Sequence, residues 1–321
     1  RAMLQAASQV NDWRAALRLL HVMERNGHGP DVYAIGHAIA ACSRATKPDS
    51  ILKLLGTLRD AGAAPELRAF NMAISCLGRA GRWEKAIETL DEMQLSGVKP
   101  TVVSYNAALS ALSKAREWEK ALDLLREMQR DGVRPDVVSY STAATACQKG
   151  GAWQHAVALL KRMNETCAGD GVNSTSMRPP APNVFTYTAA VTALAEAGKW
   201  QEALQTYDAL PPTMLPNEVL VNAAMSAASV GGEWRRAIAL LDECEAMGLV
   251  PRTSSFHLAL QTCAAAAQPA VALNILRRMR AVGVKRSLLA YNAALRSLGS
   301  SGRWQQAQRL LREMERENVK P

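Results

Sequence analysis

The chain has 321 residues, a formal net charge of +9, 48% apolar residues and only 5% aromatic residues. An apolar but aromatic-poor composition favours a helical protein over a β-sandwich, and the excess of positive charge favours a polyanionic partner such as nucleic acid. No apolar run is long enough to cross a membrane, and the six cysteines include no Cys-x-x-Cys pair, which argues against a zinc site or a disulfide framework.

Seven tryptophans mark a fixed period along the chain. Their successive spacings are 70, 35, 35, 47, 34 and 70 residues, which are one or two units of 35 apart from one deletion and one insertion. A period of this size predicts stacked helical hairpins, in which each unit packs only on its neighbours. The predicted fold is therefore all-α: an α-solenoid of about nine 35-residue helix-turn-helix repeats that forms a single array over residues 1–321.

A proline closes most units, and we place the start of each repeat two residues after it. The repeats are then 1–31 (incomplete), 32–66, 67–101, 102–136, 137–183, 184–217, 218–252, 253–287 and 288–321. The unit 253–287 is the weakest, because Pro269 stands where tryptophan is usual and Arg286 stands where the closing proline is expected. The chain begins with Arg1, so we expect a fragment or a processed form.

Repeat 102–136 illustrates one unit. Apolar residues at helical spacing predict helix A from about Val103 to Lys114, and a second amphipathic stripe predicts helix B from Trp118 to Arg130. The residues between them form a tight turn, where other repeats have a glycine that tolerates the left-handed conformation. In repeat 137–183 we predict a surface-loop insertion at about 164–182, rich in Gly, Ser, Thr and Pro. A neutral insertion at a hairpin tip is favoured over a partner-docking loop.

The unit 102–136 resembles the pentatricopeptide repeat in its period, its Tyr-Asn opening, its Ala-Leu-x-Leu core, and its Gly-Val and Pro-Asp close. The resemblance covers essentially the whole chain. It implies a protein that binds single-stranded RNA, one base per repeat, through a few side chains of each repeat. The related tetratricopeptide repeat, which binds peptides, has a Leu-Gly-x-x-Tyr pattern in helix A that is missing here.

By this resemblance, the fifth and the last residue of each repeat read one base. The pairs are Gly36 with Glu66, Asn71 with Thr101, Asn106 with Asp136, Ser141 with Asn183, Thr188 with Asn217, Asn222 with Arg252, and His257 with Ser287. The family's code implies U for Asn106–Asp136, A for Ser141–Asn183 and for Thr188–Asn217, and a pyrimidine for Asn71–Thr101 and Asn222–Arg252. The first and last pairs depart from the family pattern.

The resemblance also implies residues that contact the bases and the phosphates. The second residue of each repeat would sandwich the bases, and an apolar or planar side chain suits that role: Tyr33, Arg68, Val103, Val138, Phe185 and Val219. Leu289 holds the same place, and Ser254 does not suit it. Basic residues near the end of helix A would meet phosphates, concentrated in the first half of the array: Arg44, Arg79, Lys114 and Lys149.

Simpler interpretations exist for several of these residues. Asn, Ser, Thr and Asp near a helix start are often no more than helix caps. The tryptophans are expected to pack between helices, and Cys42, Cys147 and Cys263 share a place in helix A that suggests the core. No nucleophile elbow, phosphate loop or metal-ligand spacing is present, so we expect no enzyme, no cofactor and no metal.

Three functions stay open from the sequence. The first is a sequence-selective RNA-binding protein in organellar RNA processing, stability or translation, in a chloroplast or mitochondrion; the organelle is implied by the resemblance alone. The second is a structural subunit of an organellar ribosome or another large ribonucleoprotein complex with protein partners. The third is a peptide-binding scaffold like the tetratricopeptide proteins.

Overall fold

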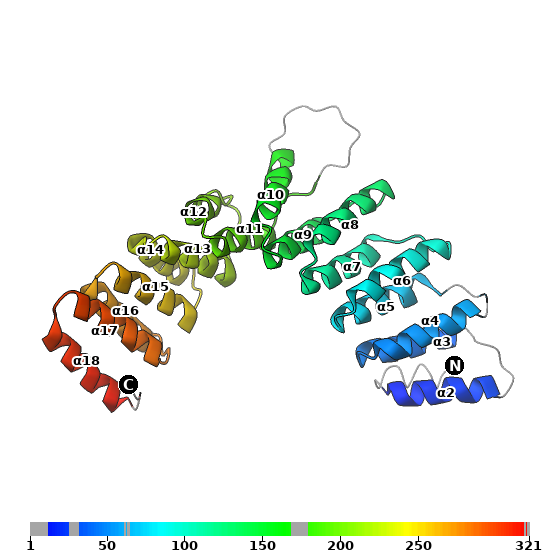
Figure 1. The fold of residues 1–321 in the computed structure, drawn as a ribbon, viewed down its shortest axis with the longest axis horizontal. Coiled ribbons are helices and arrows are strands. Elements are labelled where there is room, and N and C mark those ends of the chain that lie inside the picture. The colour runs from blue at the N-terminus through cyan, green and yellow to red at the C-terminus, as the bar shows by residue number, and fades with distance from the viewer. Residues whose placement is uncertain are drawn as a thin grey trace. The chain divides into compact units, whose positions relative to one another are not determined.

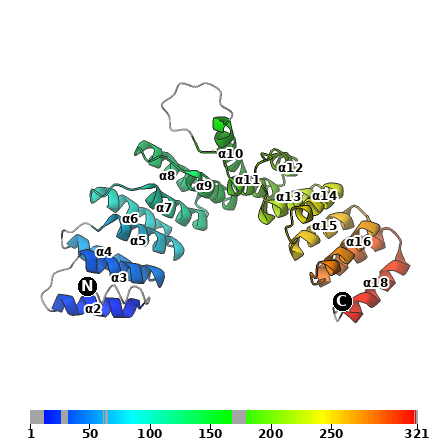
Figure 2. The ribbon, with the colours of Figure 1, turned by 180° about the vertical axis from the view of Figure 1, so that it is seen from behind.

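The computed structural model describes residues 12–25, 32–60, 62, 65–167, 179–317 and 319. All regular elements within these ranges are α-helices, and they fall into two compact units, residues 1–181 and 182–321. Figures 1 and 2 show the helices of each unit in chain order.

The described part of the first unit comprises a B helix, α2, followed by four complete hairpins. Its helices are α2 (Trp13–Arg25), α3 (Val32–Arg44), α4 (Pro48–Asp60), α5 (Leu67–Arg79), α6 (Trp83–Leu95), α7 (Val102–Ala115), α8 (Trp118–Arg130), α9 (Val137–Lys149) and α10 (Trp153–Cys167). The second unit holds another four hairpins. Its helices are α11 (Val184–Glu196), α12 (Trp200–Asp208), α13 (Glu218–Val230), α14 (Trp234–Ala246), α15 (Thr253–Ala265), α16 (Pro269–Ala281), α17 (Leu288–Ser300) and α18 (Trp304–Arg316).

The helix starts follow the period of the sequence. Every helix A, from α3 to α17 in odd numbers, begins at the first residue of a repeat as the prolines place it. Every helix B begins at a tryptophan except α4 and α16, which begin at Pro48 and Pro269. Proline suits the first turn of a helix because the amide hydrogen it lacks would have no partner there. The repeat 253–287, the weakest by sequence, therefore still folds as a complete hairpin.

Each unit is held together by its A helices. Helix A of one repeat packs against helix A of the next, and helix B packs against its own helix A and against the following one. The fourth residue of helix A fills this junction with a large buried side chain, such as Tyr105, Tyr140, Tyr187 or Tyr291. The buried Ala three residues into helix B lets the helices approach closely, as at Ala121.

The tryptophans pack between repeats, as the sequence suggested. The ring of Trp118 lies 4.8 Å from the ring of His155 in the next repeat, and Lys120 Nζ lies 3.8 Å above the ring of Trp83. A Cβ atom at Gly150 would stand only 2.4 Å from Trp118, so this glycine is needed for the close approach. The three cysteines assigned to the core, Cys42, Cys147 and Cys263, are fully buried.

The turn between the two helices uses one backbone conformation throughout. The fifteenth residue of each of the eight complete repeats has a positive φ, and in five of them it is glycine. The exceptions are Thr46, Arg116 and Ala267, with φ of 51°, 65° and 50°. A side chain in this left-handed region costs about 1–2 kcal/mol relative to glycine, so these three turns carry local strain.

The insertion differs from the sequence prediction at its start. Helix α10 continues to Cys167, so residues 164–167 are helical and not part of a loop. The physical reason is that Asn164, Glu165, Thr166 and Cys167 include no glycine or proline to stop the helix. Most of the predicted loop, residues 168–178, lies outside the described residues.

Candidate nucleic-acid interface

The closing residue of a repeat caps the helix A that follows it. The side chain of Asp136 accepts a hydrogen bond from the backbone amide of Ser139 at 2.8 Å. Asn183, Asn217 and Ser287 accept in the same way from the third residue of their helices, at 3.0, 2.8 and 3.3 Å. The capping interpretation therefore holds for these four residues, and any contact with a base would be a second task for the same side chains.

In three repeats the fifth residue is an asparagine that is tethered to the next repeat. The hydroxyl groups of Ser104, Ser139 and Ser255 each donate to the side-chain oxygen of an asparagine one repeat earlier, at 2.6 Å in all three cases. The acceptors are Asn71, Asn106 and Asn222. The same contact thus recurs three times between the third residue of one helix A and the fifth residue of the preceding one.

Two of the predicted pairs are in direct contact. Asn106 Nδ2 donates to Asp136 Oδ1 at 3.1 Å, and His257 Nε2 lies 2.7 Å from Ser287 Oγ. The Ser139 hydroxyl lies between the first pair, since it also contacts Asp136 Oδ1 at 2.9 Å. Asn106, Asp136 and Ser139 therefore form one closed network, with the asparagine amide held at both ends.

Three further pairs are not joined by a direct hydrogen bond in the described structure. Asn71 reaches Thr101 only through Ser104, whose hydroxyl lies 3.3 Å from Thr101 Oγ1. Thr188 instead donates to the carbonyl of Val184 at 2.7 Å, which is a common preference of a hydroxyl inside a helix. Arg252 forms an ion pair with Glu218 at 2.6 Å, away from Asn222.

Ser141 and Asn183 belong to different units. The hydroxyl of Ser141 donates to the carbonyl of Val138 at 3.1 Å, and Asn183 accepts from both the amide and the hydroxyl of Thr186 at 3.0 Å. Each residue is thus ordered within its own unit.

The third residue of helix A was missed in the sequence analysis. It is a buried hydroxyl residue at Ser104, Ser139, Thr186 and Ser255. Buried hydroxyl groups need a hydrogen-bond partner, and here three of them find it in the preceding repeat. The signal in the sequence was a hydroxyl residue at the third position of four repeats, where the other four complete repeats have Ala or Leu.

The second residue of each repeat is exposed although it is mostly apolar. The exposed fraction is 63% for Val103, 65% for Phe185 and 56% for Val219, and Tyr33 and Val138 are about half exposed. Leu289 at the same place is 64% exposed. Single exposed apolar residues are ordinary, but a series of them at one repeat position within each unit indicates a surface that meets an apolar or aromatic ligand.

A hollow of about 710 Å³ lies on this surface in the first unit, on α3, α5 and the start of α7. Its lining includes five residues that the sequence assigns to RNA contact: Arg44, Arg68, Asn71, Arg79 and Val103. The guanidinium group of Arg79 is anchored because it donates to both the carbonyl and the hydroxyl of Ser43. This hollow therefore brings together basic groups, a polar amide and an apolar side chain.

The other two residues predicted to contact phosphates, Lys114 and Lys149, are exposed at the ends of α7 and α9.

Two titratable groups of the interface have shifted pKa values. Burial alone would raise the pKa of Asp136, but hydrogen bonds from Ser139 and Asn106 outweigh it and lower the pKa below its ordinary value. Asp136 is therefore an ionised acceptor. Burial lowers the pKa of His257, which favours the neutral imidazole. Within the described residues no group of three His, Cys, Asp or Glu side chains could hold a metal ion, and no helix is long and apolar enough to span a membrane.

Family models match most of the chain. The model described as PPR repeat family matches residues 65–112 and 100–149. The PPR repeat model matches residues 1–28, 185–210 and 289–319. The pentatricopeptide repeat domain model matches residues 18–80 and 239–301. The chain belongs to the pentatricopeptide repeat family.

Solved pentatricopeptide repeat structures share the fold. The crystal structure of the pentatricopeptide repeat protein PPR10 from maize is 27% identical, covers all of this chain and superposes with a TM-score of 0.69. PPR10 in complex with an 18-nt psaJ RNA element is 24% identical, with a TM-score of 0.57. The present chain spans 44% and 54% of those two chains. No curated protein sequence matches at a significant level.

Proposed function

We propose that this chain binds single-stranded RNA along the A-helix surface, with one base per repeat selected by the fifth and the closing residue. The observation that carries the proposal is the recurring arrangement of a tethered polar side chain beside an exposed apolar one. In repeat 102–136 these are Asn106, held by Ser139 and Asp136, and Val103. An oriented amide suits hydrogen bonding to a base edge, and an exposed side chain suits contact with a base face.

The chemistry of the surface favours RNA over a peptide ligand. The hollow on α3 and α5 is lined by three arginines, Arg44, Arg68 and Arg79, and by one carboxylate, Glu66. Guanidinium groups beside an apolar side chain suit a phosphate backbone that carries bases. Family membership supports the same conclusion, since the relative PPR10 has been solved in complex with RNA. We further propose a role in organellar RNA processing, stability or translation, which rests on the family resemblance.

The test is a titration of the whole chain with RNAs that contain pyrimidine-U-A-A-pyrimidine, with a scrambled RNA and with the matching DNA, at two salt concentrations. Selective binding of the first RNA supports the proposal. Weak, salt-sensitive binding that ignores sequence contradicts it and favours the structural-subunit alternative, because phosphate contacts alone carry no sequence information.

A recoding variant tests the base assignment directly. Asn106→Thr together with Asp136→Asn copies the pair Thr188–Asn217, and the family's code then changes from U to A. The asparagine introduced in place of Asp136 can still cap α9, because Asn183 and Asn217 cap their helices in the same way. We expect the preferred base to change at one position by roughly tenfold. An unchanged preference for U would contradict the assignment.

A further inference from the structure

A second basic surface lies in the second unit, on B helices and away from the residues described above. A hollow of about 530 Å³ is lined by Arg280 of α16, by Arg309, Arg312 and Arg316 of α18, and by two glutamates, Glu313 and Glu317. Only charged side chains line it. The sequence analysis placed phosphate attraction in the first half of the array, so it did not anticipate this cluster.

Both glutamates already accept hydrogen bonds from other side chains of the protein. Arg286 donates to Glu313 at 2.7 Å and also to Glu317, and the hydroxyl of Tyr291 donates to Glu317 at 2.7 Å. The side chain of Arg286 is only 4% exposed. Burial alone would raise the pKa of Glu317, but these hydrogen bonds and Arg286 lower it. The carboxylates are thus bound from inside the protein, and the hollow keeps an excess of positive charge.

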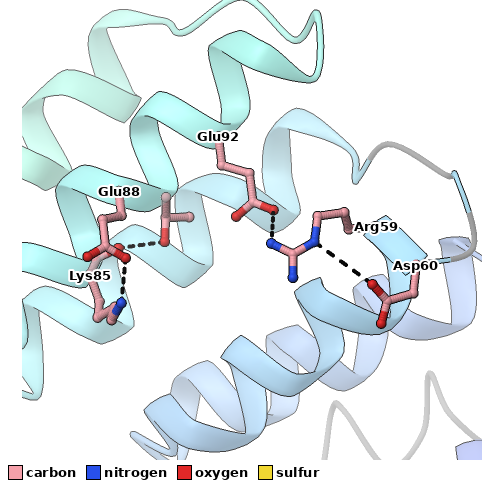
Figure 3. Close-up of polar contacts among 6 residues, drawn as sticks. Arg59, Asp60, Lys85, Glu88 and Glu92 are labelled. Atoms are coloured by element: carbon pink, nitrogen blue, oxygen red, sulfur yellow. Dashed lines mark hydrogen bonds and ion pairs between the residues drawn. The ribbon is translucent and has the colours of Figure 1, made fainter.

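The four lining arginines form no ion pair or hydrogen bond within the described part of the chain. The corresponding surface of the first unit is different. Figure 3 shows Arg59 of α4 paired with Glu92 of α6 at 3.5 Å, and Lys85 paired with Glu88 at 2.5 Å. Arg59 and Arg280 hold the same repeat position, and so do Glu92 and Glu313. In the second unit Arg286 pairs with this glutamate. Arg280 therefore has no ion pair like that of Arg59, although its charge helps to lower the pKa of Glu317.

Among the B helices of the described structure, α18 alone has arginine at its sixth, ninth and thirteenth residues; α2 comes nearest, with Arg18, His21 and Arg25. The three residues of α18 are Arg309, Arg312 and Arg316, all exposed. The same three places in α6 hold Glu88, Asp91 and Leu95. In α8 they hold Asp123, Arg126 and Arg130, which are exposed although another repeat follows. There Asp123 pairs with Arg126 at 2.7 Å. The outward direction of these side chains is therefore a property of helix B, and the unpaired positive charge is a property of α18.

We propose that this hollow binds the phosphate backbone of double-stranded RNA. The arginines of α18 extend over two helical turns, roughly 10 Å at 1.5 Å per residue, which suits a chain of phosphates better than a single phosphate ion. The lining offers no aromatic or aliphatic side chain on which an unpaired base could stack. Duplex RNA is recognised mainly through its phosphates and sugar hydroxyls. The occupant is therefore distinct from the single strand of the proposed function.

The experiment compares two matched double variants of the whole chain on an RNA hairpin that lacks the pyrimidine-U-A-A-pyrimidine sequence. Arg312→Gln with Arg316→Gln removes two charges from the hollow. Arg126→Gln with Arg130→Gln removes two charges from the same helix positions of α8. We expect the α18 variant to bind the hairpin roughly tenfold more weakly, with a salt slope reduced by about 1–2, while the α8 variant stays near the native chain.

Equal weakening in both variants would overturn the proposal, because net charge alone would then explain binding. Absence of hairpin binding by the native chain would overturn it as well, and so would an α18 variant that binds normally. Displacement of the hairpin by inorganic phosphate, beyond that caused by chloride at equal ionic strength, would show a single-phosphate site instead. Single-stranded RNA is titrated in parallel. An unchanged affinity of the α18 variant for this RNA shows that the variant is folded. If the native chain binds the hairpin but no single-stranded RNA, the proposed function is contradicted while this proposal still holds.

Discussion

Removal of the Ser139 hydroxyl should weaken base selection by Asn106. This hydroxyl is buried, donates to Asn106 Oδ1 at 2.6 Å, lies 2.9 Å from Asp136 Oδ1, and accepts from the Asp136 amide at 3.2 Å. In Ser139→Ala the asparagine oxygen loses its donor, and the amide is held only by the bond from Nδ2 to Asp136 at 3.1 Å. The amide would then present its donor and acceptor to a base in a less fixed direction.

The expected magnitudes follow from the lost contacts. A part-buried polar group without its partner costs about 1–3 kcal/mol, so Ser139→Ala should unfold at a lower denaturant concentration. A well-oriented pair of hydrogen bonds to a base contributes about 1–3 kcal/mol of discrimination. The preference for U at this base should therefore fall roughly tenfold, while preferences at the other bases stay unchanged. Ser139→Thr should retain the stability, because Thr186 holds the same place and its hydroxyl bonds to the closing residue Asn183 at 3.0 Å.

The assay is fluorescence anisotropy with four RNAs that differ only at the base assigned to Asn106 and Asp136, combined with urea unfolding of each variant. Ser113→Ala is the matched control, since it removes another nearly buried hydroxyl, at the far end of α7. If Ser139→Ala is less stable but keeps the native ratio of U to A affinities, Ser139 supports only the helix cap. That result would refute the inference that it orients the asparagine.

Three further predictions concern the turns, the phosphate contacts and pH. Arg116→Gly should stabilise the first unit by about 0.5–1 kcal/mol in urea unfolding, because it removes a side chain from a left-handed backbone position. Gly151→Ala at the same turn position should destabilise the unit. The opposite signs would contradict the strain argument. Lys114→Ala with Lys149→Ala should weaken the binding of all RNA sequences alike and reduce the salt dependence of binding by about 1.4 in slope. An unchanged slope would exclude these lysines as phosphate contacts. Because the folded pKa of Asp136 lies below its ordinary value of 3.8, its carboxylate stabilises the fold above that pH and the contribution is lost as the pH falls through the folded pKa. The stability difference between native and Asp136→Asn chains should therefore shrink below pH 3.8, and a pH-independent difference would show that Asp136 is not the cause.

The fold could be predicted almost completely from the sequence, because each repeat of a solenoid has the same pattern of helix starts, turns and buried residues. The 35-residue spacing of tryptophans and prolines set the helix starts, and the apolar stripes set the buried faces. The one error in helix extent, at residues 164–167, arose where no period was available and only local composition could be used. The recurring turn at Arg116 was predicted as a turn, but its positive φ could not be predicted because glycine, which marks it elsewhere, is missing.

The site could be predicted only in part, because hydroxyl and amide side chains choose among several partners within reach. The spacing of fifth and closing residues brought Asn106 and Asp136 together as the family resemblance implies. It could not show that Thr188 donates to a carbonyl of its own helix. It also could not show that Arg252 forms an ion pair with Glu218. The first choice depends on the rotamer of Thr188 and on a carbonyl four residues away. The second depends on Glu218, a carboxylate at the first position of its repeat, where the other complete repeats have Val, Leu or Thr.

The same side chains are required for folding and are proposed for base selection, and this double role restricts which residues can stand there. A closing residue must accept a hydrogen bond from the third amide of the next helix, which Asp136, Asn217 and Ser287 do. Only small side chains with an oxygen near the backbone can do this. Glu66 and Arg252 provide no such cap, and Glu66 also belongs to a pair that departs from the family's code. A change that keeps the cap, such as Asp to Asn, is therefore free to alter the base without unfolding the repeat. We expect a change to a long charged side chain to remove the cap and the base contact together, so that specificity and local stability fall at the same repeat.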